Sequence, residues 1–134
     1  MAKSINKKRI LVVDDDADIL SLIGHIFESE GYSVDLATNG QEAFDFLNSS
    51  KEMPGLVLLD LMMPFMDGIG FMKAVSEQPD LNGLSVVVMS ASGEREVLKK
   101  GIEASRFIKK PIDLETLVRV AQQHCSIDNP PPSA

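Results

Sequence analysis

Several short apolar runs in this chain end in side chains that can take part in chemistry. The carboxylates of Asp14, Asp15 and Asp60, the hydroxyl of Ser90 and the ammonium of Lys110 each lie within two residues of the end of such a run. Parallel strands place their carboxyl ends at one edge of a sheet, and ligands bind outside that edge. We therefore expect these groups to converge on one small crevice.

Clustered carboxylates repel one another, so such a crevice either takes up protons or binds a cation. Mg²⁺ prefers oxygen ligands and accepts one or two carboxylates together with a phosphate oxygen, and we expect that Mn²⁺ can substitute for it. A carboxylate next to the metal can act as a nucleophile towards phosphorus and form an aspartyl phosphate. Lys110 and Ser90 would each contact one phosphoryl oxygen, and the metal would hold the third.

A parallel sheet is the element that can position these groups. Five apolar runs alternate with stretches of helical spacing: Ile10–Val13, Val34–Ala37, Leu56–Leu59, Val86–Met89 and Phe107–Ile108. The second run alternates apolar and polar residues, and the fifth is short and flanked by charge, so both indicate edge strands. The sequence therefore predicts an α/β fold, a flavodoxin-like doubly wound (βα)5 parallel sheet with strand order 2-1-3-4-5 in a single domain.

Helix signals separate these runs. Apolar stripes at helical spacing follow each strand, and the fourth consists of Val97, Leu98 and Ile102. Asp16 and Asp18, the segment Thr38–Gly40, and Asp113 stand where helix caps are expected, and Gly31 stands where the first helix should stop.

The composition is that of an ordinary globular protein. The chain has 134 residues, 44% hydrophobic and 25% charged, with a net charge of −7 and one cysteine. The acidic balance argues against direct nucleic-acid binding, and the single cysteine fits a reducing compartment. No apolar run is long enough for a membrane span, so we expect a cytoplasmic protein. We predict an N-terminal lead-in over residues 1–7, one domain over 8–125, and a Pro-rich tail or linker stub over 126–134.

Four segments in this order resemble the receiver domains of bacterial two-component response regulators, over roughly Lys8 to Cys125. The segments are Ile10–Asp16, Leu58–Pro64 with Met66–Gly68, Val88–Ala91, and Lys110–Pro111. The resemblance implies a signalling phosphoacceptor, not an enzyme in the usual sense. Asp60 would take its phosphoryl group from a sensor histidine kinase or a histidine phosphotransfer protein. The chain would then act on an unknown downstream target protein, as a monomer or as a phosphorylation-dependent dimer.

The resemblance also assigns roles to the other site residues. Asp15 would bind the metal directly, Asp14 largely through water, and Met62 through its backbone carbonyl. Lys110 would contact the phosphoryl group, and its peptide bond to Pro111 would be cis.

Ser90 and Phe107 occupy the switch positions that the resemblance implies. Phe107 lacks the hydroxyl of a tyrosine, so it would signal through packing alone. Met62 and Ser92 would flank the approach of the hydrolytic water and control dephosphorylation, and their side chains predict slow decay. Residues 103–106 form a shorter loop than is usual in the family.

Two other functions compete with this one. The pair Asp14-x-Asp16 after a strand resembles the nucleophile motif of haloacid-dehalogenase-like phosphatases, although the chain has no cap insertion and Asp60 would be unexplained. A receiver used only as a scaffold is a second alternative, disfavoured by the intact acidic residues and lysine. A calcium-binding EF-hand at Asp14 is excluded, because Ile19 and His25 stand where glycine and glutamate are needed.

Overall fold

The sheet has the predicted topology. The computed structural model describes residues 3–63, 66–91, 93, 95, 99 and 107–125. Its five strands are all parallel, in the order β2-β1-β3-β4-β5, so the flavodoxin-like α/β prediction is confirmed. The strands are β1 (Ser4–Val13), β2 (Ser33–Ala37), β3 (Glu52–Asp60), β4 (Val86–Ser90) and β5 (Phe107–Lys109).

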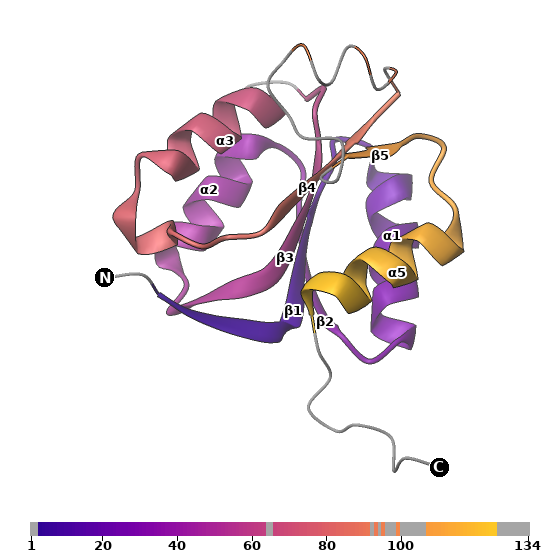
Figure 1. Ribbon diagram of the computed structural model, residues 1–134, viewed down its shortest axis with the longest axis horizontal. Coiled ribbons are helices and arrows are strands. Elements are labelled where there is room, and N and C mark those ends of the chain that lie inside the picture. The colour runs from indigo at the N-terminus through magenta and orange to yellow at the C-terminus, as the bar shows by residue number, and fades with distance from the viewer. Residues whose placement is uncertain are drawn as a thin grey trace.

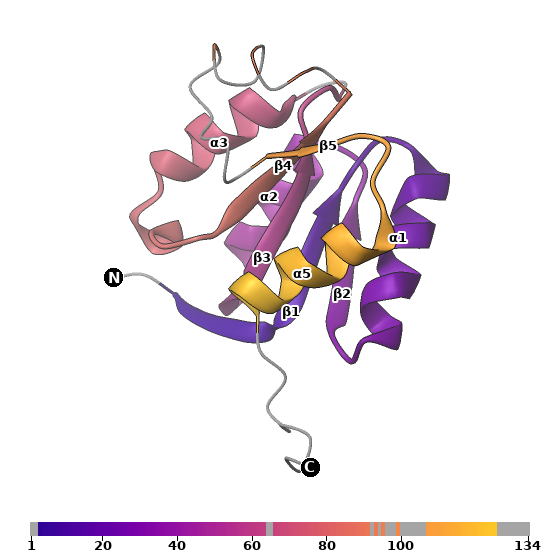
Figure 2. The same cartoon turned by 45° about the vertical axis from the view of Figure 1, so that its right-hand side comes forward.

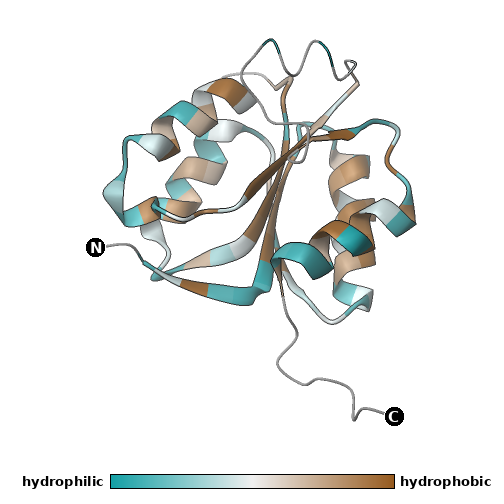
Figure 3. Cartoon of the chain, viewed as in Figure 1, coloured by the Kyte–Doolittle hydropathy of each residue, from teal (hydrophilic) through white to brown (hydrophobic). Residues whose placement is uncertain are grey.

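Four described α-helices cover the two faces of the sheet (Figures 1 and 2). They are α1 (Ala17–Ser29), α2 (Gly40–Ser49), α3 (Gly68–Ser76) and α5 (Leu114–His124), and a 3₁₀ turn, η1 (Pro79–Leu81), follows α3. The pair α1 and α5 packs on one face around Phe27 and Leu117, and the pair α2 and α3 packs on the other around Leu47 and Phe71. Hydrophobic residues concentrate on the central strands, and the helices expose polar residues (Figure 3). This arrangement buries both faces of residues 10–13 of β1 and of the strands β3 and β4.

The helices begin where polar side chains can bond to free backbone amides. The predicted caps Asp16 and Asp113 are confirmed, and within the segment Thr38–Gly40 the cap is Asn39. Asp18 lies in the first turn of α1 and is not a cap, and Asp67 caps α3. The predicted fourth helix, with its stripe at Val97, Leu98 and Ile102, lies outside the described residues. Of the helices that the structure does describe, none combines the length and the apolar sequence that a bilayer crossing requires.

The first strand begins earlier than the apolar run predicts. Residues 4–7 were expected to form a lead-in, but they belong to β1, and Ser4, Ile5 and Asn6 pair with residues 52–54 of β3. The register shifts between Asn6 and Ile10. This part of the strand is held by backbone pairing with β3 and not by burial of its side chains. Its residues are therefore largely polar, and the search for apolar runs did not detect it.

The side chain of Lys3 secures this extension. Its Nζ donates hydrogen bonds to the carbonyls of Leu47, Asn48 and Ser50 at 2.6, 3.0 and 2.7 Å. These carbonyls lie at the end of α2, where the helix leaves acceptors without partners and where positive charge is favourable. Lys3 thereby ties β1 to α2.

The end of α5 packs closely on the same region. A Cβ atom on Gly55 would lie 2.9 Å from Lys7 Cα and 3.0 Å from Cys125 Sγ, so only glycine allows this approach. Cys125 is therefore buried beneath β1 and β3, where only 6% of its surface is exposed.

Candidate functional site

The parallel strands bring two carboxylates side by side. Val13 pairs with Leu59 in the β1–β3 register, so the next residues, Asp14 and Asp60, meet at the carboxyl edge of the sheet. Ligand oxygens of Asp14, Asp15 and Asp60 all lie within 4.8 Å of one another. Asp14 is fully buried and Asp60 is 5% exposed, whereas Asp15 faces solvent. The expected carboxylate cluster is therefore present.

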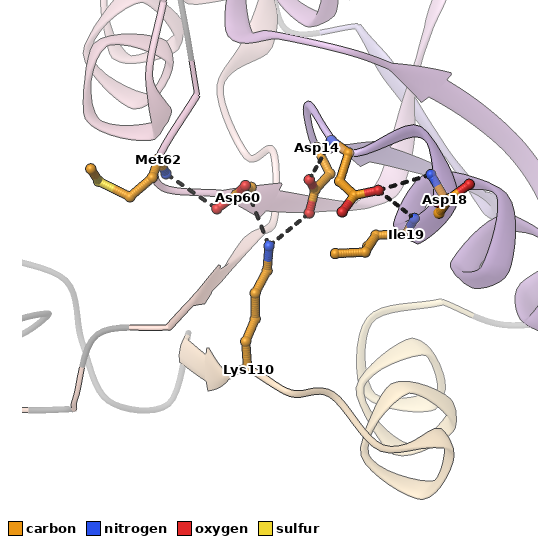
Figure 4. Close-up of polar contacts among 7 residues, drawn as sticks. Asp14, Asp18, Ile19, Asp60, Met62 and Lys110 are labelled. Carbon is orange, nitrogen blue, oxygen red and sulfur yellow. Dashed lines mark hydrogen bonds and ion pairs between the residues drawn. The ribbon is translucent and has the colours of Figure 1, made fainter.

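Lys110 completes the cluster from the other side of the crevice (Figure 4). Its Nζ lies 2.9 Å from Asp14 Oδ2 and 3.4 Å from Asp60 Oδ2. The backbone N–H of Lys110 donates to the carbonyl of Ser90 at 2.8 Å, which fixes the chain as it leaves β5. The Lys110–Pro111 peptide bond is cis, as the resemblance implied.

Backbone amides hold the remaining carboxylate oxygens. The Asp16 N–H donates to Asp14 Oδ1 at 2.9 Å, and the Met62 N–H donates to Asp60 Oδ1 at 3.2 Å. These bonds orient both carboxylates while Lys110 contacts their other oxygens. Each side chain therefore enters the crevice in a fixed orientation.

The charges in the crevice perturb one another. Burial raises the pKa of Asp60 above its ordinary value of 3.8, and the nearby Asp14 charge adds to this, while Met62 N–H and Lys110 oppose it. Burial alone would lower the pKa of Lys110, but its hydrogen bond to Asp14 and the two carboxylate charges outweigh burial and raise it. The crevice thus holds more negative charge than Lys110 alone neutralises.

The donor set fits a magnesium ion. Three carboxylates converge, and all their ligand atoms are oxygens, which Mg²⁺ and Mn²⁺ prefer. The exposed side chain of Asp15 leaves the cluster open towards solvent, which suits an ion that keeps part of its water shell.

The predicted switch residues lie on the last two strands of the sheet. Ser90 is 1% exposed and ends β4. Phe107 begins β5 opposite Val88 and packs, half-buried, against the core on the α2–α3 face. Ser90 is thus on β4, which pairs with β3, and Phe107 is on β5, which pairs with β4.

Of the two residues predicted to control dephosphorylation, the structure describes only Met62. The side chain of Met62 is 69% exposed and points away from Asp60 (Figure 4). Only its backbone N–H contacts the carboxylate. Ser92 lies outside the described residues.

Sequence reasoning did not identify the glycines that position the loop after Asp60. The Gly68 N–H donates to the Leu61 carbonyl at 3.0 Å, and a Cβ at Gly68 would lie 2.8 Å from Leu61 Cα. Gly40 approaches the Met66 carbonyl in the same way, where a Cβ would lie only 2.4 Å from the oxygen. The Asp67–Gly68 pair could have indicated this contact. A helix cap followed by glycine allows another part of the backbone to approach the start of the helix closely.

Comparison with known proteins agrees with this geometry. Residues 10–122 match the model of the response regulator receiver domain. The chain is 36% identical to sporulation initiation phosphotransferase F of Bacillus subtilis, over 82% of this chain and 87% of that protein. It is 38% identical to the chemotaxis protein CheY of Treponema pallidum, over 84% of this chain and 80% of that protein.

A solved structure supports the same assignment. The chemotaxis protein CheY4 of Vibrio cholerae superposes with a TM-score of 0.77 at 26% identity, covering 92% of this chain and 99% of that one. The family match, the sequence identities and the structural similarity lead to one conclusion. The chain belongs to the receiver domain family of two-component response regulators.

Proposed function

We propose that this receiver accepts a phosphoryl group on Asp60, from a phosphohistidine of a sensor kinase or a histidine phosphotransfer protein. The observation that carries this proposal is the position of the Asp60 carboxylate. It lies among the ligand oxygens of Asp14 and Asp15 and 3.4 Å from Lys110 Nζ. A nucleophile, a cation and a metal-binding cluster thus share one crevice.

The transfer forms one bond and breaks one. An Asp60 oxygen attacks phosphorus, and the phosphorus–nitrogen bond of the phosphohistidine breaks. Its electron pair returns to the imidazole nitrogen, and the imidazole leaves neutral when its other nitrogen already carries a proton. Lys110 stabilises the phosphoryl oxygens electrostatically, and the Ser90 hydroxyl donates a hydrogen bond to another of them.

The same crevice would hold Mg²⁺, or Mn²⁺ in its place. Asp14, Asp15, Asp60 and the backbone carbonyl of Met62 would hold it, Asp14 largely through water. When bound, the ion supplies positive charge that offsets the carboxylates and the phosphoryl oxygens.

Phosphorylation would then signal to a downstream protein from a cytoplasmic location. It adds about two negative charges, which would draw the Ser90 hydroxyl inward and let Phe107 repack. The half-buried state of Phe107 supports this, because a side chain that is not fully enclosed can change its packing at low cost.

A phosphatase that uses Asp14 as nucleophile is disfavoured. Asp14 has no exposed surface, and its two oxygens accept bonds from Asp16 N–H and Lys110. A substrate phosphorus cannot approach it, whereas the Asp60 side chain keeps 7% of its surface exposed.

Trapping the modified residue tests the proposal. The protein is incubated with Mg²⁺ and acetyl phosphate, the acyl phosphate is reduced with borohydride, and the reduced residue is located by mass spectrometry. We expect the label on Asp60 and none on Asp60→Asn, whose amide is a poor nucleophile of nearly the same shape. Label on Asp14 would establish the phosphatase alternative, and no label at all would favour the scaffold alternative.

A further inference from the structure

Met62 is the most exposed of the methionines that the structure describes. Its side chain is 69% exposed, which is unusual for a large apolar residue in this chain. The other described methionines are buried or partly buried: Met53, Met63, Met66, Met72 and Met89. Among these thioethers, a dissolved oxidant therefore reaches that of Met62 most readily.

The backbone of Met62 is fixed beside the proposed acceptor. Its N–H donates to Asp60 Oδ1 at 3.2 Å. Its neighbours Leu61 and Met63 are 3% and 9% exposed, and both belong to the core on the α2–α3 face. Of these three side chains, only that of Met62 projects outwards, away from Asp60 (Figure 4). A chemical change at its sulfur therefore occurs two residues from the acceptor, while the backbone between them stays anchored.

The single cysteine does not compete for an oxidant. Cys125 is 6% exposed, and burial raises the pKa of its thiol to about 11. The thiolate is the form that reacts with oxidants, so a buried thiol that stays protonated near neutral pH reacts slowly. Of the sulfur atoms in the part of the chain that the structure describes, Sδ of Met62 is thus the most open to oxidation.

A peroxide is an oxidant that can convert this thioether without any further reactant. The sulfur attacks one peroxide oxygen, a sulfur–oxygen bond forms, and the oxygen–oxygen bond breaks. The oxygen now on sulfur loses its proton, which the leaving hydroxide takes up to give water. The sulfur is oxidised by two electrons and the peroxide is reduced by two. The product, methionine sulfoxide, carries a polar S=O group where the thioether was only a weak hydrogen-bond acceptor.

We infer that Met62 is a redox-sensitive modification site, and that its oxidation by a peroxide shortens the life of a phosphoryl group on Asp60. The inference rests on Asp60 being the phosphoacceptor. The water that hydrolyses an aspartyl phosphate approaches from solvent, and Met62 is the first exposed side chain after Asp60 in the chain. The sulfoxide oxygen accepts a hydrogen bond from that water and helps to orient it, which a thioether does only weakly.

The test measures the site of oxidation and the rate of dephosphorylation. The protein is treated with hydrogen peroxide, the excess is removed with catalase, and peptide mapping locates the added oxygen. We expect Met62 to be oxidised before any other methionine that the structure describes. Oxidised and untreated proteins are then labelled with acetyl phosphate and Mg²⁺, the donor is removed, and the intact mass is followed. The oxidised protein should lose its phosphoryl group about two- to tenfold faster, the range that one net hydrogen bond to the attacking water corresponds to.

Two leucine variants localise the effect. Met62→Leu removes the sulfur and keeps an apolar side chain of similar size, so peroxide treatment should not change its decay rate. Met72→Leu removes a partly buried thioether of α3, and peroxide should accelerate its decay as in the wild type. Methionine sulfoxide reductases with dithiothreitol should return the oxidised wild type to its slow decay, because they restore the thioether.

Several outcomes would overturn the inference. They are oxidation of another described methionine before Met62, equal decay rates with and without peroxide, an acceleration that persists in Met62→Leu, and an acceleration that the reductases do not reverse. Absence of label on the untreated protein would instead contradict the proposed role of Asp60.

Discussion

Lys110 Nζ lies closer to Asp14 than to the proposed acceptor, at 2.9 Å from Asp14 Oδ2 and 3.4 Å from Asp60 Oδ2. Asp14 is fully buried, and Lys110 is the cation that compensates its charge. Before phosphorylation, Lys110 therefore stabilises the folded chain as well as the site. If Asp60 takes up a phosphoryl group as proposed, Lys110 would turn from Asp14 towards the phosphoryl oxygens.

Replacing Lys110 with methionine should destabilise the protein and make it more dependent on metal. Loss of one partner of a buried ion pair costs about 3 kcal/mol or more, and the loss here should be at the low end because the Lys110 side chain is 20% exposed. Mg²⁺ should restore more stability to Lys110→Met than it adds to the wild type. Denaturant unfolding with and without Mg²⁺ measures both effects. Lys109→Met is the control, since Lys109 is exposed; equal responses to Mg²⁺ in all three proteins would contradict the prediction.

Replacing Asp15 with asparagine should weaken Mg²⁺ binding by about tenfold or more, because a charged ligand is lost. The fold should not change, since Asp15 is exposed. Calorimetric titration measures the affinity, with Asp18→Asn as an exposed acidic control on the same helix start. A variant Asp15→Asn that binds as tightly as the wild type would remove Asp15 from the metal site.

Mg²⁺ affinity should also rise with pH above 3.8. Burial raises the pKa of Asp60 above that value, so protons compete with the metal for this carboxylate over a range that extends higher than for a free aspartate. Affinity should be weakest below this range and level off once Asp60 is ionised. Titrations at a series of pH values check the direction, and an affinity that falls with rising pH would exclude the carboxylate site.

A phosphoryl mimic should shift resonances at Ser90 and Phe107. Beryllofluoride bound at Asp60 would offer hydrogen-bond acceptors to the Ser90 hydroxyl and draw it inward. The space that Ser90 leaves would let Phe107 shift between two populated packing arrangements. NMR spectra with and without beryllofluoride measure this. Ser90→Ala should still bind the mimic but should show a smaller shift at Phe107. Unchanged Phe107 signals in the wild type would contradict the switch.

The aspartyl phosphate should decay slowly, and a double variant, Met62→Asn with Ser92→Glu, should decay faster by roughly tenfold. Polar side chains at these positions can orient the attacking water, and general acid–base assistance of this kind is worth about 10²-fold or more when it is well placed. The thioether of Met62 cannot donate a hydrogen bond. Loss of the phosphoryl mass after removal of the donor gives the rate, and each single variant serves as a control. A double variant that decays no faster than the wild type would contradict the role of both positions.

Much of the fold followed from the sequence because burial leaves a direct trace in residue type. Val86–Met89 is uninterrupted and apolar since both faces of β4 are covered, and the polar residue that ends it, Ser90, marks the sheet edge. The convergence of Asp14 with Asp60 followed in the same way, because parallel strands must align their carboxyl ends.

Other features left no such trace. The pairing of residues 4–6 with 52–54 depends on backbone bonds, which require no particular side chain, and Lys3 gave no sign that it caps α2. The preference of Lys110 for Asp14 over Asp60 depends on differences of about half an ångström, which spacing along a chain does not encode. The groove between α1 and the segment that joins β5 to α5 could not be predicted for a similar reason, since its two walls come from residues far apart in sequence.

The distribution of the site along the chain has a consequence for synthesis on the ribosome. Asp14, Asp60, Ser90 and Lys110 come from four strand ends, and the last of these is reached only when β5 has been translated. An acceptor carboxylate therefore exists from residue 60 onwards, but its cation arrives some fifty residues later in the sequence. Lys110 directly follows β5, which is the edge strand next to β4 in the described sheet. A nascent or truncated chain that stops short of this strand therefore carries the acidic cluster without Lys110. The proposed phosphoacceptor site of this chain is thus complete only when nearly the whole domain has been translated.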